Sequence, residues 1–396
     1  MKSARQSYRP KVLGFLLFLG YWFLSTFEGY ISGSIGAVSK YYILLLIFFL
    51  LVTAKKLSIT SSQIAIAMWA IYYMTSLFWS PNPQQGMLYV FSVMGMVVLL
   101  LLIMGLHFEK QFVNQCIHMT TIFSLFLGFL GLFFSQQYYG EIESRRVLTL
   151  LGVQLDPNNL IALYASGVGL GLYFFLFGAD LKPIARVIYG VGACVNFYDI
   201  LMCGSRTGVI VLSFLVFILL FFQPGETSKV KKIINRFFII ILIILVAIIL
   251  VSYLPPEVWE RISGQDQNLR FWDSAGRIER WMTGLSIWWD TNFLFGCGWG
   301  AFECHGTFFT FLVDTGLVGM TLLGFSLAQI GFTCIRTRQT QALLIMASGI
   351  LPAFFIGAQN RRFFWNAIIL PVMIINEYRE NKNESNSFIG GMESKN

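Results

Sequence analysis

Long apolar runs with few or no charged residues repeat along almost the whole chain, and they constrain the fold more than any other feature. A helix needs roughly 17–25 predominantly apolar residues to cross the hydrocarbon core of a bilayer. Most of the runs have about this length, so the sequence predicts an all-α polytopic membrane protein with about twelve transmembrane helices. The runs fall near residues 12–27, 36–54, 63–79, 88–106, 113–134, 157–178, 184–202, 207–223, 237–253, 306–333, 340–358 and 363–376.

The composition excludes an ordinary soluble enzyme. Of the 396 residues, 12% are charged and 56% are hydrophobic, whereas soluble domains average about 25% charged. One water-exposed globule cannot bury this much apolar surface, so lipid has to solvate much of it. The net charge of +8 does not indicate nucleic-acid binding, because the basic residues stand in short clusters between apolar runs, where they act as topology signals.

The distribution of basic residues predicts how the chain is oriented. With the N-terminus inside, 18 of the 28 Lys and Arg residues fall in cytoplasmic segments and 10 fall outside. Loops rich in Lys and Arg remain cytoplasmic, so we expect both termini in the cytoplasm. The first apolar run follows basic residues, as in a signal peptide, but it lacks a small-residue cleavage site, and we expect an uncleaved anchor.

The chain divides into four segments. Residues 1–253 hold predicted helices one to nine, and residues 306–378 hold helices ten to twelve. Between them, residues 254–305 form a long extracytoplasmic loop whose tryptophans suit amphipathic helices at the lipid headgroups. Residues 379–396 are polar and predict a disordered cytoplasmic tail. Nearly all cytoplasmic connections are short, so chemistry is expected on the outer face.

His305 is the first candidate for chemistry on that face. It is the only histidine predicted to lie on the outer side. Imidazole titrates near neutrality and can act as a general base. The alternative is an interfacial histidine at the start of a helix. His107 and His118 flank cytoplasmic helix ends and are expected to be structural.

Three arginines on the outer side break the positive-inside pattern. Arg206 stands between two apolar runs, and Arg277 and Arg280 lie in the long loop. Guanidinium groups bind phosphate oxygens with paired hydrogen bonds, so these residues indicate an anionic ligand such as a lipid pyrophosphate. The alternatives are an ion pair between Arg206 and Asp199, and a solvated helix face for the other two.

Several weaker signals surround these residues. The glycine-rich segment 296–300 predicts a tight turn and lacks the ending of a nucleotide-binding loop. Asp156 predicts a helix start, and a sugar contact from Asp156 or Asn158 is a second interpretation. The outer loops hold no paired carboxylates, so neither a metal nor a cofactor is expected. Cys297 and Cys304 share one loop, where chance proximity is favoured over a disulfide.

In their order along the chain, several short motifs resemble the O-antigen ligase and O-antigen polymerase family of bacterial membrane glycosyltransferases. In that family, a loop histidine is followed by an acidic residue and Gly-x-x-Gly, as His305 is here by Asp314 and Gly316. Gly306 is a departure, because ligases commonly carry asparagine there. The resemblance covers roughly residues 75–330. The matching segments are 79–83, 156–158, 204–207, 274–281, 296–302 and 305–319.

The resemblance implies a GT-C-like fold and a metal-independent glycosyltransferase of the bacterial cytoplasmic (inner) membrane. It implies an undecaprenyl-pyrophosphate-linked oligosaccharide as donor, a glycan as acceptor, and contacts with membrane lipids and a chain-length regulator. Arg206 and Arg277 would bind the pyrophosphate, and Arg280 would add to this cation site. His305 would accept the proton of the acceptor hydroxyl or orient that group.

Three functions follow from this sequence. The leading one is a polymerase that joins lipid-linked repeat units into O-antigen, capsule or exopolysaccharide. The nearest alternative is a ligase that moves the finished glycan to lipid A core or another acceptor, and Gly306 favours the polymerase. A transporter of lipid-linked glycans is third, because transporters place ionisable residues near the membrane midplane and often contain repeats, and neither feature is evident.

Overall fold

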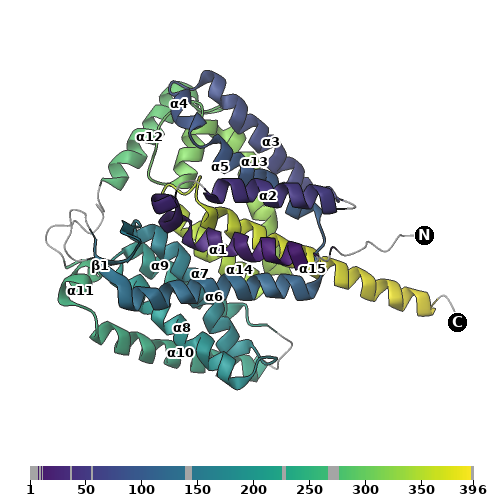
Figure 1. The fold of residues 1–396 in the computed structure, drawn as a ribbon, viewed down its shortest axis with the longest axis vertical. Helices are drawn as coiled ribbons and strands as arrows, with labels where there is room; N and C mark the ends of the chain where they lie inside the picture. The colour runs from purple at the N-terminus through teal and green to yellow at the C-terminus, as the bar shows by residue number, and fades with distance from the viewer. Residues whose placement is uncertain are drawn as a thin grey trace.

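The chain folds almost entirely into helices (Figure 1). The computed structural model describes residues 8, 10, 12–35, 38–54, 57–138, 145–224, 229–265 and 276–393. Within this described part, a helix occupies each of the twelve apolar runs. These helices are α1 (Val12–Ile35), α2 (Val38–Thr53), α3 (Ser61–Thr75), α5 (Val90–Gly105), α6 (Lys110–Phe134), α7 (Pro157–Phe177), α8 (Pro183–Met202), α9 (Arg206–Phe221), α10 (Lys229–Ser252), α13 (Thr307–Arg336), α14 (Thr340–Ala353) and α15 (Arg362–Glu393).

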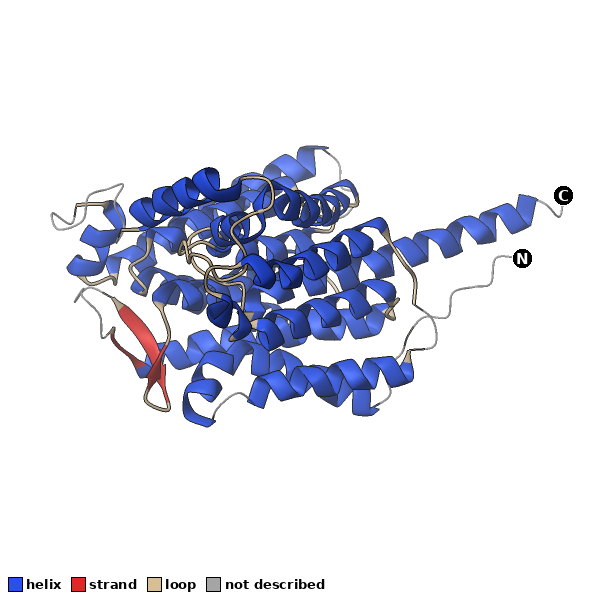
Figure 2. Cartoon of the chain, turned by 90° about the horizontal axis from the view of Figure 1, so that it is seen from above, coloured by secondary structure: helices blue, strands red, loops and turns tan. Residues whose placement is uncertain are grey.

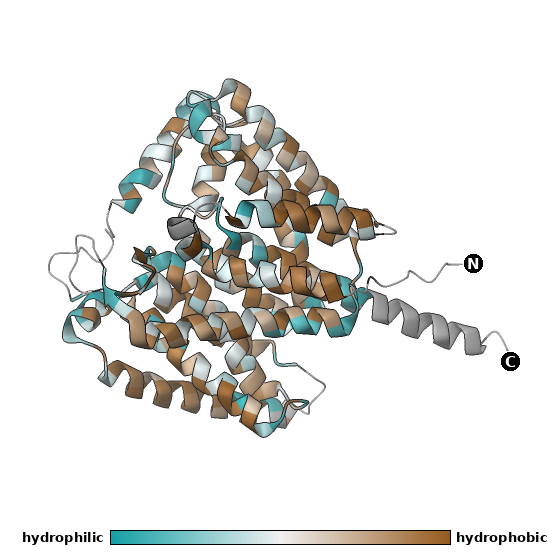
Figure 3. Ribbon diagram, in the orientation of Figure 1, coloured by the Kyte–Doolittle hydropathy of each residue, from teal (hydrophilic) through white to brown (hydrophobic). Residues whose placement is uncertain are grey.

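Six of these helices are long and apolar enough to cross a membrane by length and composition, which supports a membrane protein. They are α1, α6, α7, α8, α10 and α13. Four more, α2, α5, α9 and α14, are apolar helices of 10–17 residues. Figure 3 shows the apolar colour running along α2 and α10 in particular.

Local sequence signals set several helix starts. Thr60 and Gln63 form a capping box at the start of α3. At α7, the Asp156 carboxylate accepts a hydrogen bond of 2.8 Å from the Asn158 N–H, and Pro157 occupies the first turn. The prediction that Asp156 begins a helix is therefore confirmed.

Small residues let α6, α7 and α8 pack closely. A Cβ on Gly171 of α7 would lie 2.9 Å from the Tyr189 carbonyl oxygen of α8, so only glycine permits this approach. The Asn196 amide of α8 donates to the Ser124 and Tyr164 carbonyls of α6 and α7. Asp199, one turn further along α8, lies against Gly131 of α6.

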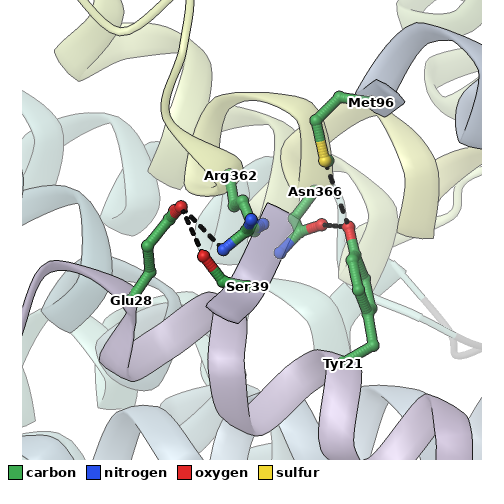
Figure 4. A network of polar contacts seen from close by, with 6 residues as sticks. All are labelled: Tyr21, Glu28, Ser39, Met96, Arg362 and Asn366. Carbon is green, nitrogen blue, oxygen red and sulfur yellow. Dashed lines mark hydrogen bonds and ion pairs between the residues drawn. The ribbon is translucent and has the colours of Figure 1, made fainter. Parts of the chain in front are cut away.

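A buried ion pair ties the first helices to the last (Figure 4). Arg362 Nη1 lies 2.7 Å from Glu28 Oε1, and Ser39 Oγ donates to the same oxygen at 3.2 Å. Nearby, the Tyr21 hydroxyl donates to Asn366 Oδ1. Losing one partner of a buried pair leaves an uncompensated charge, so these contacts fix α1 and α2 against α15.

The segment 135–156, which the sequence predicts to lie outside, adds short strands that the all-α expectation did not include. It holds an antiparallel sheet, ordered β1-β2-β3, of β1 (Ser135–Gln137), β2 (Arg146–Leu150) and β3 (Val153–Gln154). Leu151 and Gly152 join β2 to β3 with φ angles of 53° and 74°, the left-handed pair that a tight hairpin turn requires. Figure 2 shows this sheet at the end of the molecule away from both termini.

Short helices occupy the long segment before α13, as the sequence predicts. They are α11 (Pro256–Ser263) and α12 (Arg277–Asn292). Residues 266–275, which include the first two residues of the matching segment 274–281, lie outside the described residues. Two further short helices, η1 (Ser76–Trp79) and α4 (Pro83–Met87), join α3 to α5.

The C-terminal tail corrects a second expectation. Residues 379–393, predicted to be disordered, continue α15 as a helix to Glu393. Once packing of the first turns has formed a helix, each further residue adds one backbone hydrogen bond at little cost. In Figure 1, α15 projects from the end of the molecule at which α1 begins, while α11 and β1 lie at the opposite end.

Candidate active site

The glycine-rich turn folds back onto α13, which confirms the predicted turn. The N–H groups of Cys297 and Gly298 donate to the carbonyls of Val313 and Asp314 at 2.7 and 3.0 Å. Gly298 has a φ of 95°, and a Cβ there would lie 2.5 Å from Ser80 Cα. Glycine is therefore required both for the backbone conformation and for the contact with the α3–α4 connection.

Asp314 holds this turn in place. Its two carboxylate oxygens accept hydrogen bonds from the Tyr73 hydroxyl at 2.9 Å and from the Gly300 N–H at 3.2 Å. Trp299 stacks on Tyr73 with 4.1 Å between ring centroids. The acidic residue of the motif thus connects α3, the turn and α13, and α13 itself is interrupted two residues later at Gly316 (φ 62°, ψ −164°).

His305 stands between this turn and the first residue of α13. It is half-buried and has a φ of 53°, a left-handed backbone that is uncommon outside glycine and costs free energy. Burial lowers the pKa of His305 below its usual 6.5, and the nearby Arg280 and Arg277 lower it further, against raising influences from Glu303 and Asp156. The imidazole is therefore neutral at pH 7, the form that accepts a proton.

Arg277 begins α12 and lies near the same groups. Gly276 precedes it with a φ of 69°, which turns the chain into the helix. Burial lowers the pKa of Arg277, Asp156 raises it and Arg145 lowers it again, although a guanidinium remains charged in proteins. Asp156 is thus within electrostatic range of both Arg277 and His305. Arg280, one turn along α12, is exposed.

The turn that contains Ser205 and Arg206 is connected to Asp156 through hydrogen bonds. Arg206 is the first residue of α9, and the preceding Ser205 donates to Asn158 Oδ1 at 2.6 Å. Asn158 Nδ2 in turn donates to Asp156 Oδ1 at 3.2 Å. Asn158 is 1% exposed, so its side chain holds two helix starts together, in line with the structural interpretation of this residue.

Arg206 also contacts the amphipathic segment. Its Nε donates to the Arg261 carbonyl of α11 at 3.5 Å, and Arg261 Nε donates to the Gly204 carbonyl at 2.8 Å. These bonds fix α11 over the start of α9. Asp199, the alternative partner from sequence, lies against Gly131, and its buried Oδ2 has no hydrogen-bond partner among the described residues.

Arg145 is the residue that the sequence argument passed over. Burial lowers its pKa, and Asp156 raises it, so Arg145 is within electrostatic range of the same carboxylate as Arg277. Its buried Nε makes no hydrogen bond to the described residues. The available signal was the Arg145-Arg146 pair in a loop predicted to lie outside, another violation of the positive-inside pattern.

The two loop cysteines lie in one small buried cluster with Val313. Cys297 and Cys304 are free, buried thiols. Cys297 Sγ donates to the Ile287 carbonyl at 3.7 Å, whereas Cys304 Sγ lies against Gly284.

His305 is within electrostatic range of Arg277, Arg280 and Asp156. Hydrogen bonds of Ser205 and Asn158 connect the start of α9, where Arg206 lies, to Asp156. A neutral base beside fixed guanidinium groups can deprotonate a hydroxyl while stabilising a developing anion. A scan against protein-family models finds no match for this chain, and a search of curated proteins finds none either.

Proposed function

We propose that this chain is a glycosyltransferase of the bacterial cytoplasmic membrane that polymerises undecaprenyl-pyrophosphate-linked oligosaccharide repeats. The fold would be GT-C-like, with all twelve apolar helices crossing the membrane and both termini in the cytoplasm. The reaction joins an acceptor hydroxyl to the anomeric carbon of the donor sugar. The bond from that carbon to the pyrophosphate breaks, and the hydroxyl proton passes to His305.

The observation that carries this proposal is the setting of His305. A half-buried imidazole with a lowered pKa lies within electrostatic range of Arg277 and Arg280. The imidazole can therefore accept a hydroxyl proton, and the guanidinium groups can stabilise the negative charge of a leaving pyrophosphate. Arg206, held through Ser205 and Asn158, would extend this cation site.

An apolar groove supports a lipid-linked donor. It encloses about 640 Å³ between α7, α8, α9 and α10, and its lining includes Val168, Val187, Leu215 and Val246. At its outer end, the Tyr198 hydroxyl donates to the Tyr253 carbonyl at 3.5 Å. Tyr253 leads directly into α11, which contacts Arg206 through Arg261. An isoprenoid chain in this groove would thus end near the cation site.

Gly306 no longer favours a polymerase over a ligase. A Cβ on Gly306 would lie 2.7 Å from the Phe354 carbonyl oxygen and 3.3 Å from Trp281 Nε1. Packing against α12 and the α14–α15 connection therefore requires glycine here, whichever acceptor is used. The ligase remains the second candidate because its donor and its chemistry are the same.

Gel profiles of surface glycan test the proposal. A deletion strain is complemented with the wild type, with His305→Ala, or with His107→Gln as a histidine control away from the site. We expect His305→Ala to insert normally and to lose the long ladder, leaving single repeats on the acceptor. Long chains that accumulate on the lipid carrier would instead identify a ligase. A normal ladder from His305→Ala would refute the base role, and translocation of lipid-linked glycan into vesicles by that variant would favour a transporter.

A further inference from the structure

The connection between α14 and α15 forms a second wall beside His305. Two residues beyond that histidine, the Thr307 N–H and hydroxyl both donate to the Ile356 carbonyl, at 3.0 and 2.8 Å. The Ala358 N–H donates back to the Thr307 hydroxyl at 2.7 Å. Residues 354–361 are therefore fixed to the start of α13. None of them belongs to the proposed donor site.

An aromatic surface joins this wall to α12. Trp281 stacks on Phe309 of α13, with 4.9 Å between ring centroids, and lies 6.3 Å from Phe355 of the connection. Trp281 follows Arg280 directly, and its indole Nε1 is the atom that faces Gly306. The ring and its N–H therefore border the backbone that carries His305.

Trp281 and the α14–α15 connection carry three buried polar atoms with no hydrogen-bond partner within the described ranges. They are Trp281 Nε1, Gln359 Oε1 and Arg361 Nε. Gln359 is 7% exposed, so water does not satisfy it from the surface. Buried polar atoms are nearly always paired, and an unpaired set of two donors and one acceptor fits a ligand whose groups both donate and accept.

The charges indicate which ligand fits. A Cβ built on Gly357 would lie 2.8 Å from Glu303 Oε1 and 3.4 Å from Gln359 Oε1, so the carboxylate and the amide oxygen face the same glycine. A carboxylate repels phosphate, so the group that fits beside Glu303 is not an anion. Sugar hydroxyls are neutral, accept from N–H groups and donate to carboxylate and amide oxygens, and the apolar face of a sugar ring can lie on an indole.

We propose that Trp281, Glu303 and Gln359 form the acceptor subsite, which binds a neutral sugar by its hydroxyls next to His305. This inference rests on the proposed glycosyl transfer and deepens it. The arginines take the pyrophosphate, while the wall of residues 354–361 takes the sugar whose hydroxyl His305 deprotonates. Substitutions in this subsite should therefore weaken binding of the acceptor and leave binding of the donor unchanged.

Binding measurements on the purified full chain in nanodiscs test the subsite. The probes are the repeat oligosaccharide, released by mild acid from the lipid carrier of the source strain, and undecaprenyl pyrophosphate. The variants are Gln359→Leu, Glu303→Gln and Trp281→Phe. The last keeps an aromatic ring at this position and removes the indole N–H. The control is Trp289→Phe, because Trp289 lies on the same helix and is 67% exposed.

We expect each subsite variant to bind the oligosaccharide at least several-fold more weakly and to bind undecaprenyl pyrophosphate like the wild type, with the control unchanged for both probes. Unchanged oligosaccharide binding by Trp281→Phe and Glu303→Gln would overturn the subsite, even if Gln359→Leu fails to fold. Binding of undecaprenyl pyrophosphate alone by the wild type would overturn the subsite and leave the proposed function standing. Binding of neither probe would remove both.

Discussion

At the scale of single residues, the chemistry depends on neighbours that lie far away in sequence. His305 has an ordinary side chain, and its neutral form at pH 7 follows from burial and from Arg280 and Arg277 on another helix. Sequence patterns identified these residues by type and by their place on the outer side. They could not reveal that Asp156 is within electrostatic range of Arg145 and Arg277, because this proximity exists only after α7, α12 and the segment 135–156 have packed.

The pH dependence of turnover tests the pairing of Arg280 with His305. In the proposed reaction neutral His305 is the base, so activity should persist as the pH falls and be lost only when the pH passes through the lowered pKa of His305. Arg280→Gln removes one positive charge that lowers this pKa, so the acid limb of kcat/KM should move to higher pH. The shift between wild type and variant should shrink at high salt, because Arg280 is exposed and screened.

Arg146→Gln is the matched control for this measurement. Arg146 is also an exposed arginine, in a segment predicted to lie outside, and the substitution removes the same charge. Its acid limb should coincide with that of the wild type. Equal shifts in the two variants would mean that overall charge, and not proximity to His305, sets the profile.

At the scale of single elements, glycines decide where helices stop and where backbones meet. Gly316 interrupts α13 with a φ of 62° and a ψ of −164°, a region that only glycine occupies readily. A Cβ there would collide with the Leu294 carbonyl oxygen. Gly324 lies on the same helix and would place a Cβ in open space.

Alanine substitutions at these two glycines should therefore have opposite effects. Gly316→Ala should lower the free energy of unfolding by about 2 kcal/mol or more, through backbone strain and the collision. Gly324→Ala should raise it by up to about 1 kcal/mol, because alanine favours a helix. Unfolding of the purified protein in detergent measures both. A stable Gly316→Ala variant would show that the interruption in α13 is not required.

The α10 helix offers a second test at this scale. Val246 lines the apolar groove, whereas Ile244 on the same helix does not line it and is 52% exposed. Val246→Trp should fill part of the groove and raise KM for the full-length polyprenyl donor several-fold. The wild type and Val246→Trp should use a donor analogue with a short isoprenoid chain equally well. Ile244→Trp should behave like the wild type, and an equal effect from both tryptophans would indicate a general disturbance of α10.

At the scale of the whole molecule, the sequence predicted the parts that depend on local pattern. Every apolar run became a helix because apolar length and helix formation are properties of one segment. The sheet was missed because it pairs short segments across a loop, such as Ser135 with Leu148, and such short strands carry little periodic signal. The helical tail was missed because composition alone predicted disorder, whereas α15 extends from a packed start.

The orientation of the molecule in the membrane is the final test, because it decides whether His305 meets substrate on the outer face. Glu257 in α11 and Lys182 before α8 are both exposed, and they belong to segments predicted outside and inside. With Cys194 replaced by alanine, the remaining native cysteines are all buried and should label weakly. In intact spheroplasts, a membrane-impermeant maleimide should modify Glu257→Cys at once and Lys182→Cys only after permeabilisation. The reverse pattern would place the arginines and His305 in the cytoplasm, where an outer-face polymerase cannot work.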